Sequence, residues 1–270
     1  MKFDAPSVRL SDMDSLHLLS AARSAVGLIR NGNEDGALTH PQLIAVADGM
    51  GGHAGGEIAS AIALEILARR ATVFTDIQMD KDSADDYFNS AIDEIDSALK
   101  LASDDDPTLS GLGTTLTALF IRDNQAVLLH VGDSRCYRLR GNTLEQLSND
   151  HTVIQELLDQ GAISTAEAAE HPQRSMLTQA LRGDGDVTPV LQMYEVKKGD
   201  RYLLCSDGLS GVLTEKEIKV GLKKSDKDEA VKFLIDATYV NGAPDNVTVL
   251  IADISDTSTT SPSLLGAAHD

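Results

Sequence analysis

The 270-residue sequence has no tryptophan, two cysteines and few aromatic residues, which make up 4% of the chain. It also lacks long apolar runs. No stretch of about 18 residues is free of charge, so we expect no membrane-spanning segment in this chain. The first fifteen residues, MKFDAPSVRLSDMDS, contain neither a continuous apolar segment nor a cleavage-site pattern. They therefore do not read as a signal peptide.

Basic residues are scarce as well. The 23 Lys and Arg residues face 42 Asp and Glu residues, which gives a formal net charge of −19. Nucleic acids and anionic membranes would repel such a chain, so we exclude both as partners. The two cysteines, Cys136 and Cys205, lie far apart in strand-like runs. Without an export signal we expect them to be reduced core residues in a cytoplasmic protein.

The pattern of apolar residues predicts more strands than helices. Strand-like runs cover 17–29 and 43–47, and several more lie between 114 and 150 and after 190. Helical spacing appears from Gly56 and over about 83–101. Most strands have no helix between them, which argues against a doubly wound parallel sheet. We therefore predict an α+β fold, in which two antiparallel sheets form a central sandwich flanked by helices.

Changes in composition divide the chain into three parts. We expect a flexible lead-in over 1–15, a single domain over 16–254, and a disordered tail or the start of a linker over 255–270, which is rich in Ser and Thr. Within the domain, about 151–182 form a mostly helical insertion between strands. Ser164 and Glu167 make a capping box for one of its short helices.

Acidic residues stand at the ends of several apolar runs, often beside glycine. In LIAVADGMGG, the apolar run stops at an aspartate, and five glycines follow within eight residues. The same kind of junction recurs along the chain, at Asp133, Asp207, Asp245 and the pair Glu34 and Asp35.

Any one such aspartate has an ordinary explanation in a turn or a helix cap. Several carboxylates that met at the ends of the sheets would repel one another unless cations lay between them. Oxygen ligands without a Cys or His cluster suit Mg²⁺ or Mn²⁺. A bare glycine turn would then leave room for a backbone carbonyl or a substrate. Composition alone does not show that these acids converge.

A calcium-binding protein without catalysis is a weaker alternative, because no loop of closely spaced ligands is present.

An ordered set of segments resembles the metal-dependent Ser/Thr protein phosphatases of type 2C in their bacterial form. The set runs from about 18 to 253 and comprises RNGNED, ADGMGGHAGGE, GLGTTL, HVGDSRCYRLR, NDHTVIQELLDQG, HPQRSMLTQAL, GDRYLLCSDGLSG and PDNVTVL. Each segment is weak alone, but their order is specific. The family fold is a β-sandwich flanked by helices.

The resemblance implies a role for each matching acid. Asp48 resembles the carboxylate that bridges two metal ions. Asp207 and Asp245 resemble further ligands of one ion, and Asp35 with the Gly49 carbonyl resembles the ligand set of the other. Asp133 resembles a ligand of a third ion, with Asp207 shared.

Three further residues take different roles in the resemblance. Arg30 matches the arginine that grips the substrate phosphate, for which a guanidinium fork is suited. Glu34 stands where some family members have a metal-linked acid and bacterial ones often have a neutral residue, and we expect it to have an outer-shell role. Some family members have a His directly after Asp-Gly, proposed as the general acid, but here His53 lies three residues later. His53 is therefore either the proton donor or a loop residue without a chemical role.

Together these observations predict a phosphatase that hydrolyses phosphoserine and phosphothreonine in proteins. A hydroxide held between two Mn²⁺ or Mg²⁺ ions would attack phosphorus, and a third ion could assist. The expected partners are Ser/Thr protein kinases and their phosphorylated substrates, and we expect a monomer. The alternative is a pseudophosphatase that serves as a binding module. Such a protein should have lost a metal ligand, and this sequence retains every matching aspartate.

Overall fold

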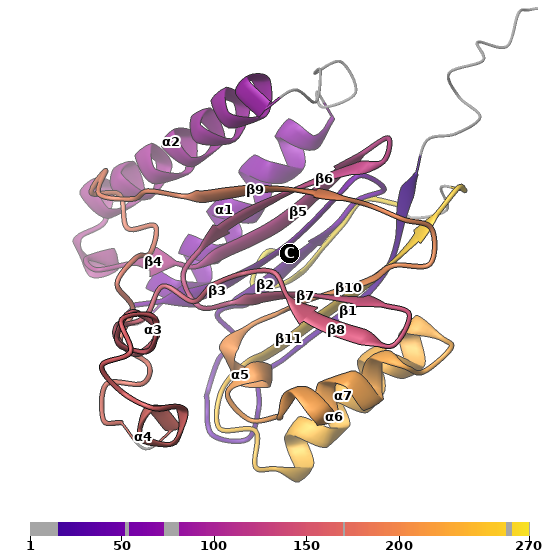
Figure 1. Ribbon diagram of the computed structural model, residues 1–270. Coiled ribbons are helices and arrows are strands. Elements are labelled where there is room, and N and C mark those ends of the chain that lie inside the picture. Colours follow the sequence, from indigo (N-terminus) through magenta and orange to yellow (C-terminus); the bar gives the residue numbers. More distant parts are fainter. Residues whose placement is uncertain (1–15, 52–53, 73–80, 170, 258–260, 270) are drawn as a thin grey trace, which may run out of the picture.

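The computed structural model describes residues 16–51, 54–72, 81–169, 171–257 and 261–269. They form two antiparallel sheets stacked face to face (Figure 1). The first sheet has five strands, in the order β1 (His17–Ala25), β11 (Val247–Ser255), β10 (Arg201–Cys205), β7 (Arg135–Arg140) and β8 (Thr143–Gln146).

The second sheet has seven strands and carries the longest central hairpins. Its order is β12 (Ser263–Gly266), β2 (Asp35–Thr39), β3 (Leu43–Met50), β5 (Leu116–Arg122), β6 (Gln125–Val131) and β9 (Val190–Glu195), and the short β4 (Gly113–Thr114) also pairs with β3.

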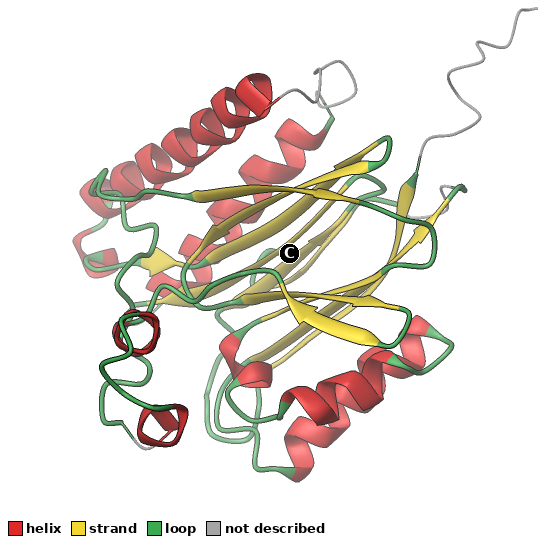
Figure 2. Cartoon of the chain, in the orientation of Figure 1, coloured by secondary structure: helices red, strands yellow, loops and turns green. Residues whose placement is uncertain are grey.

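Helices cover both outer faces of the sandwich (Figure 2). On the second sheet lie α1 (Gly55–Ala71) and α2 (Lys81–Asp105), which leads into a short 3-10 turn at Pro107–Leu109. On the first sheet lie α5 (Asp207–Ser210), α6 (Glu215–Leu222) and α7 (Lys227–Val240). The layers thus run helix, sheet, sheet, helix, and the predicted α+β sandwich is confirmed.

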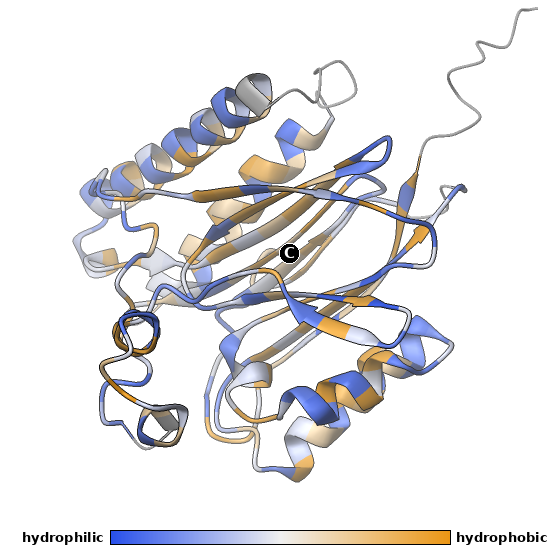
Figure 3. Ribbon diagram, in the orientation of Figure 1, coloured by the Kyte–Doolittle hydropathy of each residue, from blue (hydrophilic) through white to orange (hydrophobic). Residues whose placement is uncertain are grey.

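Three apolar layers hold the sandwich together. One lies between α1, α2 and the second sheet, where the Phe88 and Phe120 rings are 6.1 Å apart. One fills the space between the sheets and includes Tyr202 and Cys136. The third lies under α6 and α7. Figure 3 shows the matching alternation of apolar and polar residues along strands and helices. Burial of this apolar surface is the main force that closes the fold.

The insertion carries α3 (Val153–Asp159) and α4 (Thr165–Ala169) and stands beside one end of the sandwich (Figure 1). The predicted capping box is confirmed: Glu167 accepts from the Ser164 backbone NH at 2.8 Å, and the Glu167 NH donates to Ser164 Oγ. A backbone bridge from Thr152 to Leu177 joins the two ends of the insertion to each other, and a second from Leu181 to Thr114 ties its C-terminal end to the rest of the domain.

The expectation of a tail without regular structure is wrong for Ser263–Gly266. These residues form β12, which pairs with β2 from Ser263 opposite Thr39 to Gly266 opposite Gly36. Two leucines in a Ser/Thr-rich segment give no periodic signal, yet the free edge of β2 supplies backbone partners for them. The predicted flexible lead-in over 1–15 lies outside the described residues.

Cys136 and Cys205 are free and buried, as predicted for reduced core residues. Within the described ranges, no helix is both long enough and apolar enough to cross a membrane.

Candidate metal centre

The antiparallel pairing brings the acidic strand ends to one end of the sandwich. Asp35 at the start of β2 lies directly opposite Asp48 near the end of β3. Asp133 follows β6, Asp207 begins α5 just after β10, and Asp245 stands two residues before β11. The two sheets therefore both contribute carboxylates to the same place.

A pocket of about 390 Å³ lies at this point. Its wall holds four of the predicted ligand aspartates, together with Arg30, Glu34 and the glycine turn. The full lining is Arg30, Glu34, Asp48, Gly49, Met50, Gly51, Thr115, Asp133, Ser175, Leu177, Asp207 and Asp245. We call it the acidic pocket.

Four carboxylates in and under the acidic pocket have a pKa above the ordinary value of an aspartate. Burial, with the charges of Asp35 and Asp207, raises the pKa of Asp48 well above its ordinary value. Burial also raises the pKa of Asp35 to about 7 and, with the charge of Asp207, that of Asp133 to about 7. Burial and the charge of Asp245 raise the pKa of Asp207. Mutual repulsion of this kind favours a bound cation.

The arrangement suits hydrated hard cations better than a closed cage. Among the described residues, no group of three or more His, Cys, Asp or Glu side chains is close enough to hold a metal ion by itself. Mg²⁺ is typically held by one or two carboxylates and keeps several waters, and all-oxygen surroundings also suit Mn²⁺. Aspartates spread around the wall of the acidic pocket therefore fit such ions.

Backbone contacts fix Asp48 at the centre of the site. Its NH donates to Thr115 Oγ1 at 3.1 Å, and its carbonyl accepts from the Thr115 NH at 2.9 Å and from Thr114 Oγ1 at 3.0 Å. Thr115 Oγ1 is also 2.8 Å from Ser134 Oγ, next to Asp133. Thr115 thus links the loop of Asp133 to the end of β3 that carries Asp48.

The glycines of this turn are required mainly by close backbone packing. A Cβ on Gly49 would lie 2.0 Å from the Gly56 carbonyl oxygen and 2.6 Å from that of Glu34. A Cβ on Gly56 would lie 2.7 Å from the Glu34 carboxylate. The absence of side chains therefore lets the start of α1 pack directly on the end of β3, beside the 34–35 segment.

The structure places Glu34 and Asp35 at different depths around the acidic pocket. Glu34 is partly buried and lines the acidic pocket, although the resemblance gives it an outer-shell role. Asp35 is 1% exposed, and its Oδ2 accepts a hydrogen bond from Ser206 Oγ at 2.7 Å. Asp35 therefore lies behind Asp48, and its role as a direct ligand stays a prediction.

Arg30 reaches the acidic pocket from the loop between β1 and β2. Its Nη2 donates to Asp245 Oδ2 at 2.8 Å, and its side chain is half exposed. The loop is held by Asn246, which sequence reasoning missed. Asn246 Nδ2 donates to the carbonyls of Val26 and Gly32 at 2.8 Å, and Asn246 Oδ1 accepts from the Glu34 NH. His53, the candidate proton donor, lies outside the described residues.

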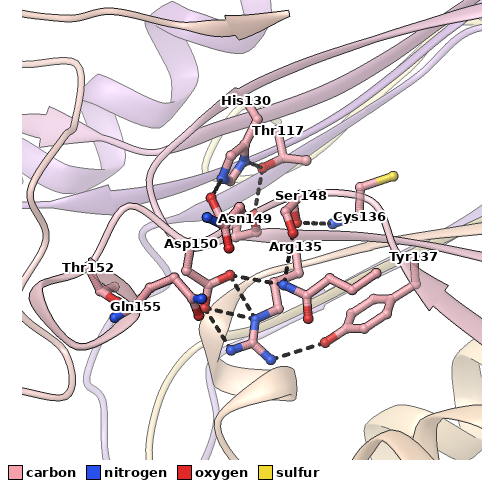
Figure 4. Close-up of polar contacts among 12 residues, drawn as sticks. Thr117, His130, Arg135, Cys136, Tyr137, Ser148, Asn149, Asp150, Thr152 and Gln155 are labelled. Carbon is pink, nitrogen blue, oxygen red and sulfur yellow. Dashed lines mark hydrogen bonds and ion pairs between the residues drawn. The ribbon is translucent and has the colours of Figure 1, made fainter. Parts of the chain in front are cut away.

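Sequence reasoning also missed an ion pair between Arg135 and Asp150 (Figure 4). Arg135 Nε and Nη2 donate to the Asp150 carboxylate at 2.7–2.9 Å, and Arg135 Nη1 donates to Tyr137 Oη at 3.1 Å. The Asp150 side chain is 9% exposed. Because Asp150 precedes the N-cap of α3, the pair anchors the entry of the insertion to β7.

A second polar chain runs beside this ion pair. His130 lies opposite Thr117 in the β5–β6 ladder, and its Nδ1 is 2.9 Å from Thr117 Oγ1 (Figure 4). Burial and the neighbouring His151 lower the pKa of His130 to about 3, so it is neutral. The Gly132 NH donates to His151 Nδ1 at 3.1 Å. The insertion thus contacts the backbone directly before Asp133.

A larger cavity of about 550 Å³ adjoins the acidic pocket on the insertion side. It shares Asp133, Ser175, Asp207 and Asp245 with the acidic pocket and reaches Ile154 and Leu158 of α3. The cavity therefore offers room for a ligand that extends beyond the acidic pocket.

Comparison with known proteins gives a consistent result. Residues 34–242 match the family described as Protein phosphatase 2C. The Ser/Thr protein phosphatase PstP of Mycobacterium tuberculosis is 42% identical over 257 residues, which are 94% of this chain and 48% of that protein. The chain thus spans about half the length of these mycobacterial relatives. The Ser/Thr phosphatase stp of Listeria welshimeri is 35% identical over 86% of this chain and 94% of its own.

Solved structures agree with the sequence matches. A crystal structure of M. tuberculosis PstP has a TM-score of 0.80 at 42% identity and covers 88% of this chain and 98% of that one. The PstP catalytic domain in complex with two manganese ions has a TM-score of 0.80 at 40% identity and covers 88% and 99%.

Proposed function

This chain belongs to the protein phosphatase 2C family, and we propose that it hydrolyses phosphoserine and phosphothreonine in proteins with the help of divalent metal ions. One observation supports this above the others. Acidic side chains from both sheets meet at one pocket, with one arginine at its edge. Phosphoryl transfer needs cations and positive donors where negative charge develops.

Under this proposal the aspartates Asp48, Asp133, Asp207 and Asp245 hold Mn²⁺ or Mg²⁺, with Asp35 and the Gly49 carbonyl in support. The manganese ions of the PstP catalytic domain favour the same metals here. When bound, such ions activate water for attack on phosphorus and neutralise phosphoryl charge. A covalent route through cysteine is disfavoured, because burial raises the pKa of Cys205 to about 12.

The test of the proposal is turnover of two substrates, p-nitrophenyl phosphate and a phosphothreonine peptide, with Mn²⁺ and with EDTA. We expect hydrolysis of both with Mn²⁺ only. A pseudophosphatase would bind the peptide without turnover, and absence of turnover with Mn²⁺ and Mg²⁺ would contradict the proposal. Every matching aspartate is present, so nothing in the chain favours that alternative.

Arg30 would orient the phosphoryl group by a forked pair of hydrogen bonds. Arg30→Ala should lower kcat/KM by about 10–150-fold, the equivalent of roughly 1.5–3 kcal/mol for a charged hydrogen bond. The Mn²⁺ concentration that gives half-maximal activity should not rise, since the change frees Asp245 from its ion pair. Steady-state kinetics over a Mn²⁺ series measure both. Arg30→Lys, which keeps the charge without the fork, should recover only part of the activity. Normal kinetics with weakened metal binding would contradict this role.

Stability without metal should depend on pH. Asp35 has a pKa of about 7 in the fold and an ordinary value near 4 when unfolded, so the folded state holds the extra proton between these values. Stability should therefore fall as pH rises from about 5 to 8, on the order of 2–4 kcal/mol for this buried group. Melting curves in EDTA at several pH values measure this.

Saturating Mn²⁺ should reverse that loss, because metal ligands bind as carboxylates. At 100 times the dissociation constant the gain is about 2.7 kcal/mol. The gain should be larger at pH 8 than at pH 5. A melting temperature that rises with pH in EDTA, or that does not respond to Mn²⁺, would contradict the clustering of these carboxylates.

The physiological partners would be phosphoproteins, among them Ser/Thr kinases and their substrates. The cavity beside the insertion could receive the chain around the phosphorylated residue, and the insertion would act as a flap there. A monomeric state and a cytoplasmic location remain predictions from the sequence.

A further inference from the structure

Two large apolar side chains stand exposed directly before Arg30. Leu28 is 60% exposed and Ile29 is 71% exposed. Burial of a Leu or Ile side chain is favourable, so leaving two neighbouring ones in water forgoes that stabilisation. Scattered exposed apolar residues are common, but two neighbours beside a functional arginine call for an explanation. We call Leu28 and Ile29 the apolar rim.

The apolar rim sits on a fixed backbone. Although the strand-like pattern runs to 29, β1 ends at Ala25. Gly27 then has φ +82° and packs so closely that a Cβ would lie 2.1 Å from the Asp245 carbonyl oxygen. Its NH donates to Tyr239 Oη at 3.0 Å, and the Leu28 NH donates to the Ala243 carbonyl at 2.8 Å. The backbone that carries Leu28 is therefore anchored to the end of α7.

A shallow hollow continues from Ile29 along the other side of Arg30. Its volume is about 300 Å³, and Glu34, Glu57 and Asn246 are among its lining residues. Two carboxylates in the hollow, together with those of the acidic pocket, would repel an acidic side chain. The rest of the lining, Arg30, Asn31, Gly32 and Asn33, is polar or bare, so the apolar contact comes from the rim alone, and the carboxylates beside it disfavour an acidic side chain there.

We propose that the apolar rim binds an apolar side chain next to the phosphorylated residue of the substrate protein, and so selects substrates. The proposal rests on the proposed function, because it uses Arg30 as the phosphate contact. An extended segment advances about 3.3 Å per residue. With the phosphate at Arg30, a residue one or two positions away reaches Leu28 and Ile29. The substrate class is thus a phosphopeptide segment with a Leu, Ile, Val, Met or Phe near the phosphoresidue.

The test compares three phosphothreonine peptides in which the two residues next to the phosphothreonine on one side are both Leu, both Ser or both Glu. A second set of three carries the same residues on the other side. The measured quantity is the ratio of kcat/KM between peptides, from which any general loss of activity cancels. For the wild-type protein with Mn²⁺, we expect kcat/KM for the Leu peptide to exceed that for the Ser peptide by about tenfold on one side. We expect kcat/KM for the Glu peptide to be lower than that for the Ser peptide. One buried apolar group has an effect of this size.

The variant Leu28→Ser with Ile29→Ser should bring the Leu-to-Ser ratio to within about twofold of one. Leu28→Ile with Ile29→Leu should keep the preference, because size and apolar character are retained. Leu101→Ser removes a side chain of similar exposure, 63%, from α2. This matched control should also keep the preference.

Several results would overturn the inference. One is a wild-type protein that cleaves all peptides without preference, or a preference that survives the double serine variant. Another is a dimer that becomes monomeric in that variant while selectivity stays unchanged, which would assign the rim to a second copy of the chain. A wild-type protein that hydrolyses no phosphopeptide overturns the proposed function and this inference with it.

Discussion

Replacing Asp48 with Asn should lower phosphatase activity by at least about a hundredfold, the scale seen when one electrostatic group is removed from an active site. Asn has nearly the same shape but no charge. Asp48 lies opposite Asp35, and burial and then the charges of Asp35, Asp207, Asp133 and Asp245 raise its pKa. The Asp48 carboxylate therefore interacts electrostatically with all four of these aspartates. Hydrolysis of p-nitrophenyl phosphate with saturating Mn²⁺ measures the effect.

The same variant should fold normally, and this separates loss of the site from loss of structure. The backbone bonds of Asp48 to Thr114 and Thr115 do not involve its carboxylate. With one repelling charge gone, the melting temperature in EDTA at pH 8 should stay level or rise, while the gain from Mn²⁺ should shrink. Asp104→Asn, an exposed change on α2, is the matched control and should behave as wild type. Activity of Asp48→Asn within tenfold of wild type would contradict the two-ion assignment.

Asp150→Ala should destabilise the fold by about 3–5 kcal/mol, because it leaves the Arg135 guanidinium largely buried without its partner. Such a loss is a large share of the stability of an ordinary domain. Urea unfolding measures the change. Exposed pairs contribute little, so Asp236→Ala, which breaks a surface pair with Lys232, should cost under about 1 kcal/mol.

Replacing both partners tests whether the loss of stability comes from the unpaired charge of Arg135. Arg135→Met combined with Asp150→Leu should recover much of the stability lost in Asp150→Ala, since apolar pairs often replace buried ion pairs without cost. If Asp150→Ala unfolds at the same urea concentration as Asp236→Ala, the pair does not anchor the insertion.

Local patterns predicted the layers of the fold because each strand and helix carries its own signal. The run LIAVA is continuously apolar since both faces of β3 are covered, and the Gly141-Asn142 pair marks the tight β7–β8 hairpin. The acids of the site could be singled out because they interrupt apolar runs at strand ends.

The positioning residues gave no such signal. Asp150 stands before a helix N-cap, where an aspartate reads as an ordinary turn residue, and only the fold brings Arg135 to it. Asn246 has its side chain bonded to residues more than 200 positions earlier. Whether Glu34 or Asp35 faces the pocket depends on the direction in which each side chain points at the start of β2. A single sequence does not determine that direction at a strand end.

The pairing of β1 with β11 has a consequence for when the proposed activity would arise during synthesis. His17 lies opposite Ser255, and Arg30 meets Asp245 across 215 positions of sequence. Contacts between such distant positions form slowly, because the closure of a long loop must precede any gain from them. A ribosome-bound chain that has emerged only as far as α7 therefore has neither Asp245 nor β11 in place. Catalytic competence would appear abruptly, after β11 has joined β1, rather than accumulate as the domain grows.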